Sequence, residues 1–322
     1  MSQEVKNIIT VGASAGGIAA VSKLLAGFKN DLNAAIFVVI HLARGSDDKI
    51  ILRQIQKETS FTCILPKDGD PILENRVYFA PVNHHMLIEK NRIAIRSGAY
   101  ENHWRPSIDV LFRSAAAAYD SCVTGIILTG LLDDGTSGMS AIKRSGGRCM
   151  VQDPEEADFP DMPNNVLRNM EVDYKGSIND ISYVLADLYA RSDCEVGNVP
   201  EDIKVEAAIA MRMSSTYQDI ANLGHIFPFT CPDCGGSLIK VEADDVPRYR
   251  CYTGHTYTEK ILENEQIRGL EESIWVAVRM MEERKNLLGS MKGYDVNMKN
   301  EKIEQMVIHI ERLKKILLDL ND

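Results

Sequence analysis

Residues 12–17, GASAGG, follow the apolar run IITV at 8–11 and precede the helix-like segment IAAVSKLL at 18–25. A short β-type run, a tight glycine turn and a helix are the parts of a βα unit. The stretch therefore predicts that a strand near the start of the chain delivers its carboxyl end to the N-terminus of a helix.

Two chemistries use this turn. A phosphate-binding loop has the pattern G-x-G-x-x-G, whose central glycine lets the backbone approach a pyrophosphate, but the central residue here is Ser14. The alternative pattern, Gly12-x-Ser14-x-Gly16, presents a serine oxygen at a helix N-terminus, where free N–H groups can hold an oxyanion. We favour the nucleophile; a helix-capping serine is the third interpretation. The phosphate alternative predicts NAD or FAD binding, and we expect none.

From about residue 6 to 191, apolar β-type runs alternate with helical segments, which predicts an α/β fold: a mostly parallel sheet flanked by helices in a Rossmann-like three-layer arrangement. The run at 35–40 is apolar throughout, as expected for a strand buried on both faces. Segments 86–89 and 92–95 predict a hairpin at the sheet edge. Further strands are expected at 77–80, 122–128 and 149–152, and helices at 107–118, with Ser107 as the cap, 138–145 and 181–190.

Composition narrows the classes of function. The 322 residues carry a formal net charge of −10, which argues against nucleic-acid binding and attraction to anionic membranes. Residues 1–6 lack a secretory signal pattern, and no apolar run approaches the roughly 20 residues that span a bilayer. The seven cysteines lack the spacing of a disulfide framework. We therefore expect a cytoplasmic protein with no membrane insertion.

Three polar residues are expected at one rim of the sheet. Ser14 follows the first strand, His41 ends the second, and Asp134 lies just beyond the strand that ends near residue 128. The carboxyl ends of parallel strands share an edge, where ligands bind. A serine becomes nucleophilic when a histidine takes its proton and a carboxylate orients that histidine. Asp133 is adjacent to Asp134, and either carboxylate could instead form a turn or a cap.

Four residues near the C-terminal third have the spacing of a metal site. They are Cys231 and Cys234 in C-P-D-C-G-G, and Cys251 and His255 in C-Y-T-G-H. This set predicts a structural Zn²⁺ in a small ribbon, because four protein ligands leave no open position. The alternatives are a redox C-x-x-C and four unrelated residues. The other cysteines are interpreted as core thiols (Cys63, Cys122, Cys149) and an exposed linker residue (Cys194).

The tail has helical periodicity. Apolar residues recur at three- and four-residue steps at Ile303, Met306, Ile310, Leu313, Leu317 and Leu320, and an earlier helix carries Ile274, Val278, Met281 and Leu288. The two helices are expected to pack on each other; docking of a partner or self-association is the alternative. We divide the chain into a catalytic domain at 1–191, a linker and helix at 192–226, a zinc-ribbon-like module at 227–262 and a helical hairpin or coiled-coil tail at 263–322.

Several separated motifs resemble the catalytic domain of the chemotaxis protein-glutamate methylesterases (CheB). They are GASAGG at 12–17, the strand-end His41, YFAP at 78–81 with HM at 85–86, H-x-RPS-x-DVLF at 103–112, LTG at 128–130 with DG at 134–135, and MP at 162–163. The resemblance covers about residues 7–188. It implies hydrolysis of glutamate methyl esters on chemoreceptors, with receptor glutamine deamidation in some members.

The resemblance also implies roles for single residues. The triad falls on Ser14, His41 and Asp134, which selects Asp134 over Asp133, and catalysis needs no cofactor. Ala15 and Leu131 are expected to line the oxyanion site. Leu131 stands where the family has a methionine, but a main-chain donor survives that change.

Other expectations concern the substrate and regulation. His85 is expected to support the site, and Arg105 to contact acidic substrate. Methylated chemoreceptor-type proteins are the expected partners, and a regulatory partner could bind the C-terminal helices. The family's usual N-terminal receiver domain has no counterpart in the resemblance, so phosphorylation control within this polypeptide is not expected. The competing hypothesis is a non-catalytic signalling or docking protein that keeps the fold.

Overall fold

A computed structural model describes residues 5–28, 32–43, 45–191, 194, 197–244, 246–292 and 296–320. Residues 1–4, used above to exclude a secretory signal, and most of the predicted linker start at 192–196 lie outside the described residues. The chain forms two compact units, Met1–Thr258 and Glu259–Asp322. The four-part division made from the sequence stays a prediction.

The centre of the first unit is a parallel sheet. Within the described residues it has seven strands in the order β3-β4-β2-β1-β7-β8-β9, and every pairing is parallel. The first two strands are buried at every position, as the apolar runs predicted. The bounds are β1 Asn7–Ala13, β2 Ala34–Ile40, β3 Thr62–Ile64, β4 Arg76–Phe79, β7 Val123–Ile127, β8 Arg148–Gln152 and β9 Tyr174–Gly176.

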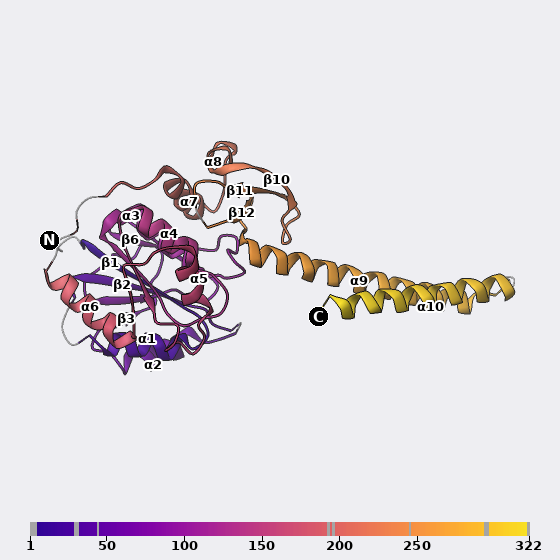
Figure 1. Ribbon diagram of the computed structural model, residues 1–322, viewed down its shortest axis with the longest axis horizontal. Helices are drawn as coiled ribbons and strands as arrows, with labels where there is room; N and C mark the ends of the chain where they lie inside the picture. The colour runs from indigo at the N-terminus through magenta and orange to yellow at the C-terminus, as the bar shows by residue number, and fades with distance from the viewer. Residues whose placement is uncertain are drawn as a thin grey trace. The chain divides into compact units, whose positions relative to one another are not determined.

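Helices cover both faces of this sheet (Figure 1). Because side chains of a strand alternate between faces, Ile8 of β1 joins one core while Ile9 and Val11 join the other. One core packs under α1 Gly17–Ala26, α2 Asp48–Gln56 and α6 Ile178–Arg191, and the other under α3 Ile108–Tyr119, α4 Thr136–Arg144 and α5 Asp161–Asn169. The predicted three-layer α/β class is confirmed.

The predicted hairpin forms but does not lie at the edge of the main sheet. Strands β5 His85–Glu89 and β6 Arg92–Arg96 pair with each other as a separate two-stranded sheet. Met86 and Ile88 join the core beneath α3, while Leu87 and Ala94 pack with Val110 of α3. Both faces of the hairpin are thus occupied by side-chain packing against helices, which holds it away from the sheet edge.

The first unit continues beyond residue 191. Helices α7 Glu201–Arg212 and α8 Tyr217–Leu223 lead into a four-stranded antiparallel sheet, here called the ribbon. Its strands are β10 Gly224–Thr230, β11 Ser237–Val241, β12 Arg248–Cys251 and β13 Thr256–Thr258. The ribbon therefore starts three residues before the predicted module and ends four residues earlier.

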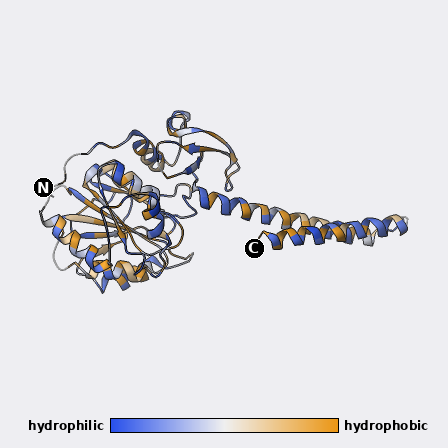
Figure 2. Cartoon of the chain, viewed as in Figure 1, coloured by the Kyte–Doolittle hydropathy of each residue, from blue (hydrophilic) through white to orange (hydrophobic). Residues whose placement is uncertain are grey.

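The second unit is a pair of long helices, α9 Glu259–Ser290 and α10 Val296–Asp319. Their shared apolar cluster contains most of the predicted seam: Ile274, Val278, Met281, Ile310, Leu313, Leu317 and Leu320. Figure 2 shows hydrophobic and hydrophilic residues alternating along both helices. The predicted packing of the two helices on each other is confirmed. Among the described residues, no helix is both long and apolar enough to cross a membrane.

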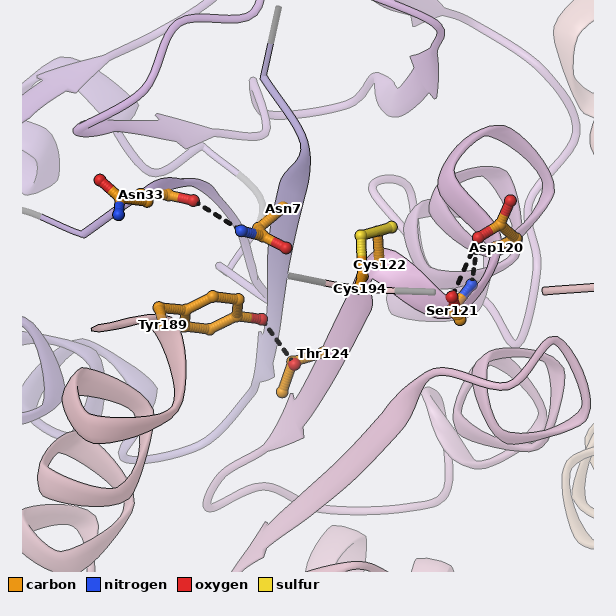
Figure 3. Close-up of a disulfide and its surroundings, with 8 residues drawn as sticks. All are labelled: Asn7, Asn33, Asp120, Ser121, Cys122, Thr124, Tyr189 and Cys194. Carbon is orange, nitrogen blue, oxygen red and sulfur yellow. Dashed lines mark hydrogen bonds between the residues drawn. A yellow bond between two sulfur atoms is a disulfide. The ribbon is translucent and has the colours of Figure 1, made fainter. Parts of the chain in front are cut away.

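One disulfide corrects the interpretation of two cysteines. Cys122, taken as a core thiol, is bonded to Cys194, taken as an exposed linker residue, with a Cα–Cα distance of 5.2 Å (Figure 3). The end of α6 lies over β7, where the Tyr189 and Thr124 hydroxyls hydrogen-bond at 2.6 Å, and the chain then returns to the start of β7. This return is a tertiary contact that local sequence does not encode. Cys63 and Cys149 are buried free thiols, as predicted.

Candidate active site

Ser14 and His41 leave neighbouring strands at the same level. Ala13 and Ile40 are the last paired residues of β1 and β2, and the His41 N–H donates to the Ala13 carbonyl at 3.0 Å. The Ser14 N–H donates to Thr129 O at 3.0 Å. The parallel register thus brings the serine and the histidine to one rim, as the sequence predicted.

The turn after Ser14 depends on glycine. Gly16 caps α1 with a φ of 75°, in the left-handed region where a Cβ is strained. The Gly17 N–H at the start of α1 donates to the Ser14 carbonyl at 2.8 Å. Ser14 is therefore held on a tight strand-to-helix turn.

His41 and Asp134 are joined by a buried hydrogen bond. The Nε2–H of His41 donates to Oδ2 of Asp134 at 2.9 Å, and the two side chains are 0 and 1 % exposed. Asp134 lies immediately before Gly135, the N-cap of α4. The pairing expected from strand-end positions therefore exists in the structure.

Asp134 is also held at the N-terminus of α3. Its Oδ2 accepts the Ile108 N–H at 2.7 Å, and its Oδ1 accepts the Ser107 hydroxyl at 2.9 Å and the Asn102 amide at 3.2 Å. Burial alone would raise the pKa of Asp134, but the hydrogen bonds and the charge of His41 hold that pKa below its ordinary value. The carboxylate therefore stays ionised beside the imidazole.

The second nitrogen of His41 is available for proton transfer. His41 Nδ1 is buried and has no hydrogen-bond partner among the described residues. Because Nε2 carries a proton to Asp134, Nδ1 of the neutral ring is its basic nitrogen. The indole of Trp104 stacks on the imidazole, with centroids 3.9 Å apart and an interplanar angle of 6°. The ring is thus fixed by a carboxylate at its edge and an indole on its face.

The loop after β7 lies against Ser14. A Cβ added at Gly130 would stand 2.8 Å from Ser14 Cβ and 2.1 Å from Met162 Sδ, so only glycine fits there. The next residue, Leu131, has 45 % of its surface exposed. On the other side, Ala15 accepts a hydrogen bond from the Thr129 hydroxyl at 3.1 Å. Ala15 follows Ser14 in the chain, and Leu131 follows Gly130, which packs against Ser14. Both predicted oxyanion residues therefore lie next to Ser14 or to a residue in contact with it.

Two hollows lie beside the histidine. Ser14 and His41 line one of them, together with residues such as Ser46 and Gln54. Trp104 lines the other with Arg105, and Leu42 contributes to both. The first hollow therefore borders both Ser14 and His41.

The two predicted substrate-side residues differ in position. His85 is buried: its Nε2–H donates to Ala99 O at 2.9 Å, its Nδ1 accepts the Ser107 N–H at 3.2 Å, and burial lowers its pKa. It therefore orients the residue that holds Asp134. The guanidinium of Arg105 binds Asn83 Oδ1 at 2.8 Å and stacks over Tyr100 at the second hollow.

The four predicted metal ligands also converge. The ligand atoms of Cys231, Cys234, Cys251 and His255 all lie within 4.8 Å of one another. The Cys234 and Cys251 sulfurs are 3.8 Å apart, and His255 Nδ1 lies 3.6 Å from the Cys231 sulfur and 3.5 Å from the Cys251 sulfur. The C-x-x-C turn closes through the Gly235 N–H, which donates to Cys231 O at 2.8 Å.

Sequence reasoning missed two contributors to the site, Asn102 and Trp104. They lie in an irregular turn between the β5–β6 hairpin and α3, where no periodic pattern or strand end marks them. The only signal was their place directly before the R-P-S segment at 105–107.

Comparisons with known proteins agree on one family. A model of the CheB methylesterase family matches residues 9–185. A "Putative protein-glutamate methylesterase/protein-glutamine glutaminase" of Leptospira interrogans is 36% identical over 186 residues, 58% of this chain and 94% of that protein. A Methanosarcina mazei protein-glutamate methylesterase/protein-glutamine glutaminase 2 is 31% identical over 178 residues, and the match spans 48% of its length.

A solved structure has the same fold. The Thermotoga maritima CheB methylesterase catalytic domain superposes with a TM-score of 0.55 at 26% identity, covering 58% of this chain and 100% of that one. The family match ends at residue 185, before α7, the ribbon and the two long helices.

Proposed function

The chain belongs to the CheB methylesterase family, and on this premise we propose that it hydrolyses methyl esters of glutamate side chains in chemoreceptor-type proteins, with Ser14, His41 and Asp134 as catalytic triad. The observation that carries the proposal is the buried 2.9 Å hydrogen bond between His41 and Asp134, one strand away from Ser14. A protein that only docks a partner has no need of this arrangement.

The proposed reaction assigns one role to each residue of the triad. His41 Nδ1 takes the proton of Ser14 Oγ as the oxygen attacks the ester carbonyl, and Asp134 stabilises the imidazolium. Main-chain N–H groups at Ala15 and Leu131 hold the oxyanion, each contributing about 3 kcal/mol in the transition state. Methanol leaves with the proton from His41. Water then gives His41 a proton and attacks the acyl-enzyme, and the glutamate is released as Ser14 regains its proton.

The same site can act on glutamine. An amide passes through the same kind of tetrahedral intermediate, with ammonia as the leaving group in place of methanol. The double names of the Leptospira and Methanosarcina relatives favour this second activity. We propose deamidation of receptor glutamines as an additional reaction of the triad.

Methanol release from methylated receptor tests the enzyme. The purified full chain should release methanol, and Ser14→Ala should lower kcat by at least about 10³-fold. Ser60→Ala is the control, because this serine is exposed and does not line the hollow beside Ser14, and it should leave kcat within about twofold of the parent. Equal release by the parent and Ser14→Ala would refute the serine mechanism, and no release by either would favour the docking protein.

We also propose that the four-residue cluster binds a structural Zn²⁺. Zn–S bonds of about 2.3 Å and Zn–N bonds of about 2.0–2.1 Å give tetrahedral edges of about 3.8 Å between sulfurs and about 3.5 Å between sulfur and nitrogen. The observed separations of 3.8, 3.6 and 3.5 Å fit these edges. A bound Zn²⁺ would stabilise a ribbon that has a small apolar core.

Metal analysis tests this site. Purified protein should contain one zinc per chain by elemental mass spectrometry, and Cys231→Ser or His255→Ala should abolish its retention. Cys63→Ser is the control, because Cys63 is a buried thiol in the main domain. Full zinc retention by both ligand variants would refute the assignment.

The remaining proposals concern place and partners. We propose that the protein works in the cytoplasm, on the cytoplasmic parts of receptors, and that α9 and α10 bind a regulatory partner. The support for the latter is a set of exposed apolar side chains on these helices, among them Trp275, Met280, Ile308 and Leu318.

A further inference from the structure

The turn Glu101–Trp104 touches both the ribbon and the triad. It is closed by the Glu101 N–H, which donates to Trp104 O at 3.3 Å, and by the Trp104 N–H, which donates to Glu101 O at 2.8 Å. Between them, Asn102 and His103 have φ values of 49° and 65°. Two successive residues in the left-handed region make a costly backbone, which persists where neighbouring structure holds it.

Strand β13 of the ribbon supplies that support. The Asn102 N–H donates to Thr256 O at 2.9 Å, and Asn102 Oδ1 accepts the Thr258 N–H at 3.2 Å. Glu101 also forms a parallel bridge with Thr256. Thr256 is the chain neighbour of His255, a member of the metal-ligating cluster. The strand that holds the turn therefore begins at the residue directly after the cluster member His255.

The opposite side of the turn contacts Asp134 and His41, the two residues proposed to activate Ser14. The side-chain amide of Asn102 donates to Asp134 Oδ1 at 3.2 Å and to Asp109 Oδ2 at 3.0 Å. The indole of Trp104 covers the face of His41. The turn therefore restrains the carboxylate through a hydrogen bond and the imidazole through stacking.

Buried ion pairs connect the ribbon to the catalytic domain and to α7 beside this turn. Glu101 pairs with Arg113 of α3, and its other oxygen lies 3.5 Å from Arg250 of β12. Arg248 of β12 makes a bidentate pair with Glu206 of α7, both contacts being 2.8 Å. These side chains are at most 4 % exposed. Removing one partner would leave an uncompensated buried charge, so separating the ribbon from the catalytic domain at these pairs would be costly.

A second set of contacts joins the ribbon to α4, the helix that follows Asp134. Asp244, in the ribbon loop before β12, accepts the hydroxyls of Ser137 and Ser140 of α4, both at 2.9 Å. Helix α4 begins two residues after Asp134. The ribbon thus contacts the loop of the catalytic carboxylate from two directions, through Asn102 and through α4.

We infer that the ribbon is a positioning element of the active site, and that metal binding by its Cys/His cluster sets the alignment of His41 and Asp134 through the turn Glu101–Trp104. This inference rests on the proposed hydrolase function. Asn102 and Trp104 are positioning residues, since they act through Asp134 and His41. Without the metal, His255 is released, β13 loses its register, and the turn loses the hydrogen bonds that support it. Asp134 keeps Ser107 and Ile108, so activity should fall without vanishing.

Trp104 provides a readout that is independent of activity. The chain has two tryptophans, and Trp275→Phe leaves Trp104 as the sole one. Chelation of the metal from this variant should change the emission of Trp104, because an imidazole stacked on an indole quenches it, and adding Zn²⁺ back should restore the signal. Over the same titration kcat should fall about 10- to 100-fold, the effect of losing a hydrogen bond to a charged group.

The controls separate the possible failures. Tyr252→Ala changes an exposed ribbon residue next to Cys251 and should behave as the parent. Far-UV circular dichroism measures whether the α/β domain stays folded when the metal is removed. Metal removal with unchanged Trp104 emission would overturn the inference. Because emission is measured without substrate, this result is distinct from failure of the methylesterase assay.

A variant that keeps the metal tests the same path if chelation unfolds the domain. Asn102→Ala should bind one zinc, lower kcat about 10- to 100-fold and change KM by less than about threefold, because the residue acts on Asp134 and not on substrate. Asn222→Ala on α8, an exposed amide, is the matched control and should leave kcat unchanged. Zinc-loaded Asn102→Ala with the kcat of the parent would overturn the inference.

Discussion

Among single residues, Asp134 shows how the site combines two requirements. A buried carboxylate is costly unless hydrogen-bond donors surround it. Here the donors are the imidazole it orients, the first N–H groups of α3, and the side chains of Ser107 and Asn102. The groups that keep the carboxylate ionised therefore also fix its direction toward His41.

Replacing this carboxylate should affect the chemical step. We expect Asp134→Asn to lower kcat by about 10⁴-fold, because the imidazole loses the partner that selects its tautomer and stabilises its protonated form. Asp133→Asn is the matched control and should keep most of the activity. Steady-state methanol release by both variants checks this, and a larger loss for Asp133→Asn would move the triad to that residue.

Glu206 gives a second prediction at this scale, for stability. Its side chain is 1 % exposed and pairs with Arg248 while lying 3.7–3.9 Å from Arg250 and Arg113. Glu206→Gln should lower the free energy of unfolding by about 3–5 kcal/mol, because buried guanidinium groups lose their counter-charge.

Glu201 on the same helix is the control for this variant. Its side chain is 79 % exposed, and Glu201→Gln should change the free energy of unfolding by less than about 0.5 kcal/mol. Urea unfolding followed by circular dichroism measures both variants. Equal effects would show that the Glu206 cluster contributes nothing beyond a surface pair.

Among the elements, the α9–α10 pair depends on a narrow apolar seam. Ile310 is 2 % exposed in that seam, whereas Ile308 on the same helix is 45 % exposed. Ile310→Ala should destabilise the helical pair by about 2–4 kcal/mol and Ile308→Ala by less than about 0.5 kcal/mol. Thermal unfolding followed at 222 nm compares them, and similar shifts for both would contradict the seam.

Local sequence patterns predicted the elements that an apolar run or a capping residue marks. The apolar runs of β1 and β2 are buried at every position, and the Ser107 hydroxyl accepts the Val110 N–H at 3.4 Å as the N-cap of α3. The hairpin β5–β6 was misplaced, because its two apolar runs, at 86–88 and 93–95, predict buried strands without showing which elements cover their two faces. Helices α2 and α5 were not predicted.

The candidate site could likewise be predicted only where local patterns mark its residues. Strand ends and spacing predicted that Ser14, His41 and Asp134 share a rim, because parallel strands deliver their carboxyl ends to one edge. Asn102 and Trp104 reach that rim through an irregular turn held by a strand more than 150 residues away in the sequence. Such long-range contacts leave no local signature.

For the whole molecule, the buried carboxylates make stability depend on pH. The positive charges of Arg248 and Arg113 hold the pKa of Glu206 below its ordinary value of 4.5 against the opposing effect of burial, and the pKa of Asp134 is also lowered. The unfolded chain then binds more protons than the folded one in this range, so the stabilisation is complete above about pH 5 and is lost as pH falls.

Urea unfolding between pH 6 and pH 3 checks this expectation. The parent should lose stability steadily as pH falls below about 5, and Glu206→Gln should show a shallower loss because it lacks one of the two groups. The same slope in both proteins would show that Glu206 titrates alike in the folded and unfolded chain.

Thiol counting tests the disulfide at the same scale. The chain has seven cysteines, of which Cys122 and Cys194 are bonded and five are free. Denatured, metal-free protein should react with about five equivalents of a thiol reagent before reduction and about seven after it. Seven equivalents before reduction would contradict the bond.

The ring of His41 faces Asp134 through Nε2, and this orientation has a consequence for inhibitor chemistry. An electrophilic affinity label that binds beside the serine would be attacked by the nitrogen nearest the main chain. Acid hydrolysis of the labelled protein should then yield the π-alkylated histidine rather than its τ isomer.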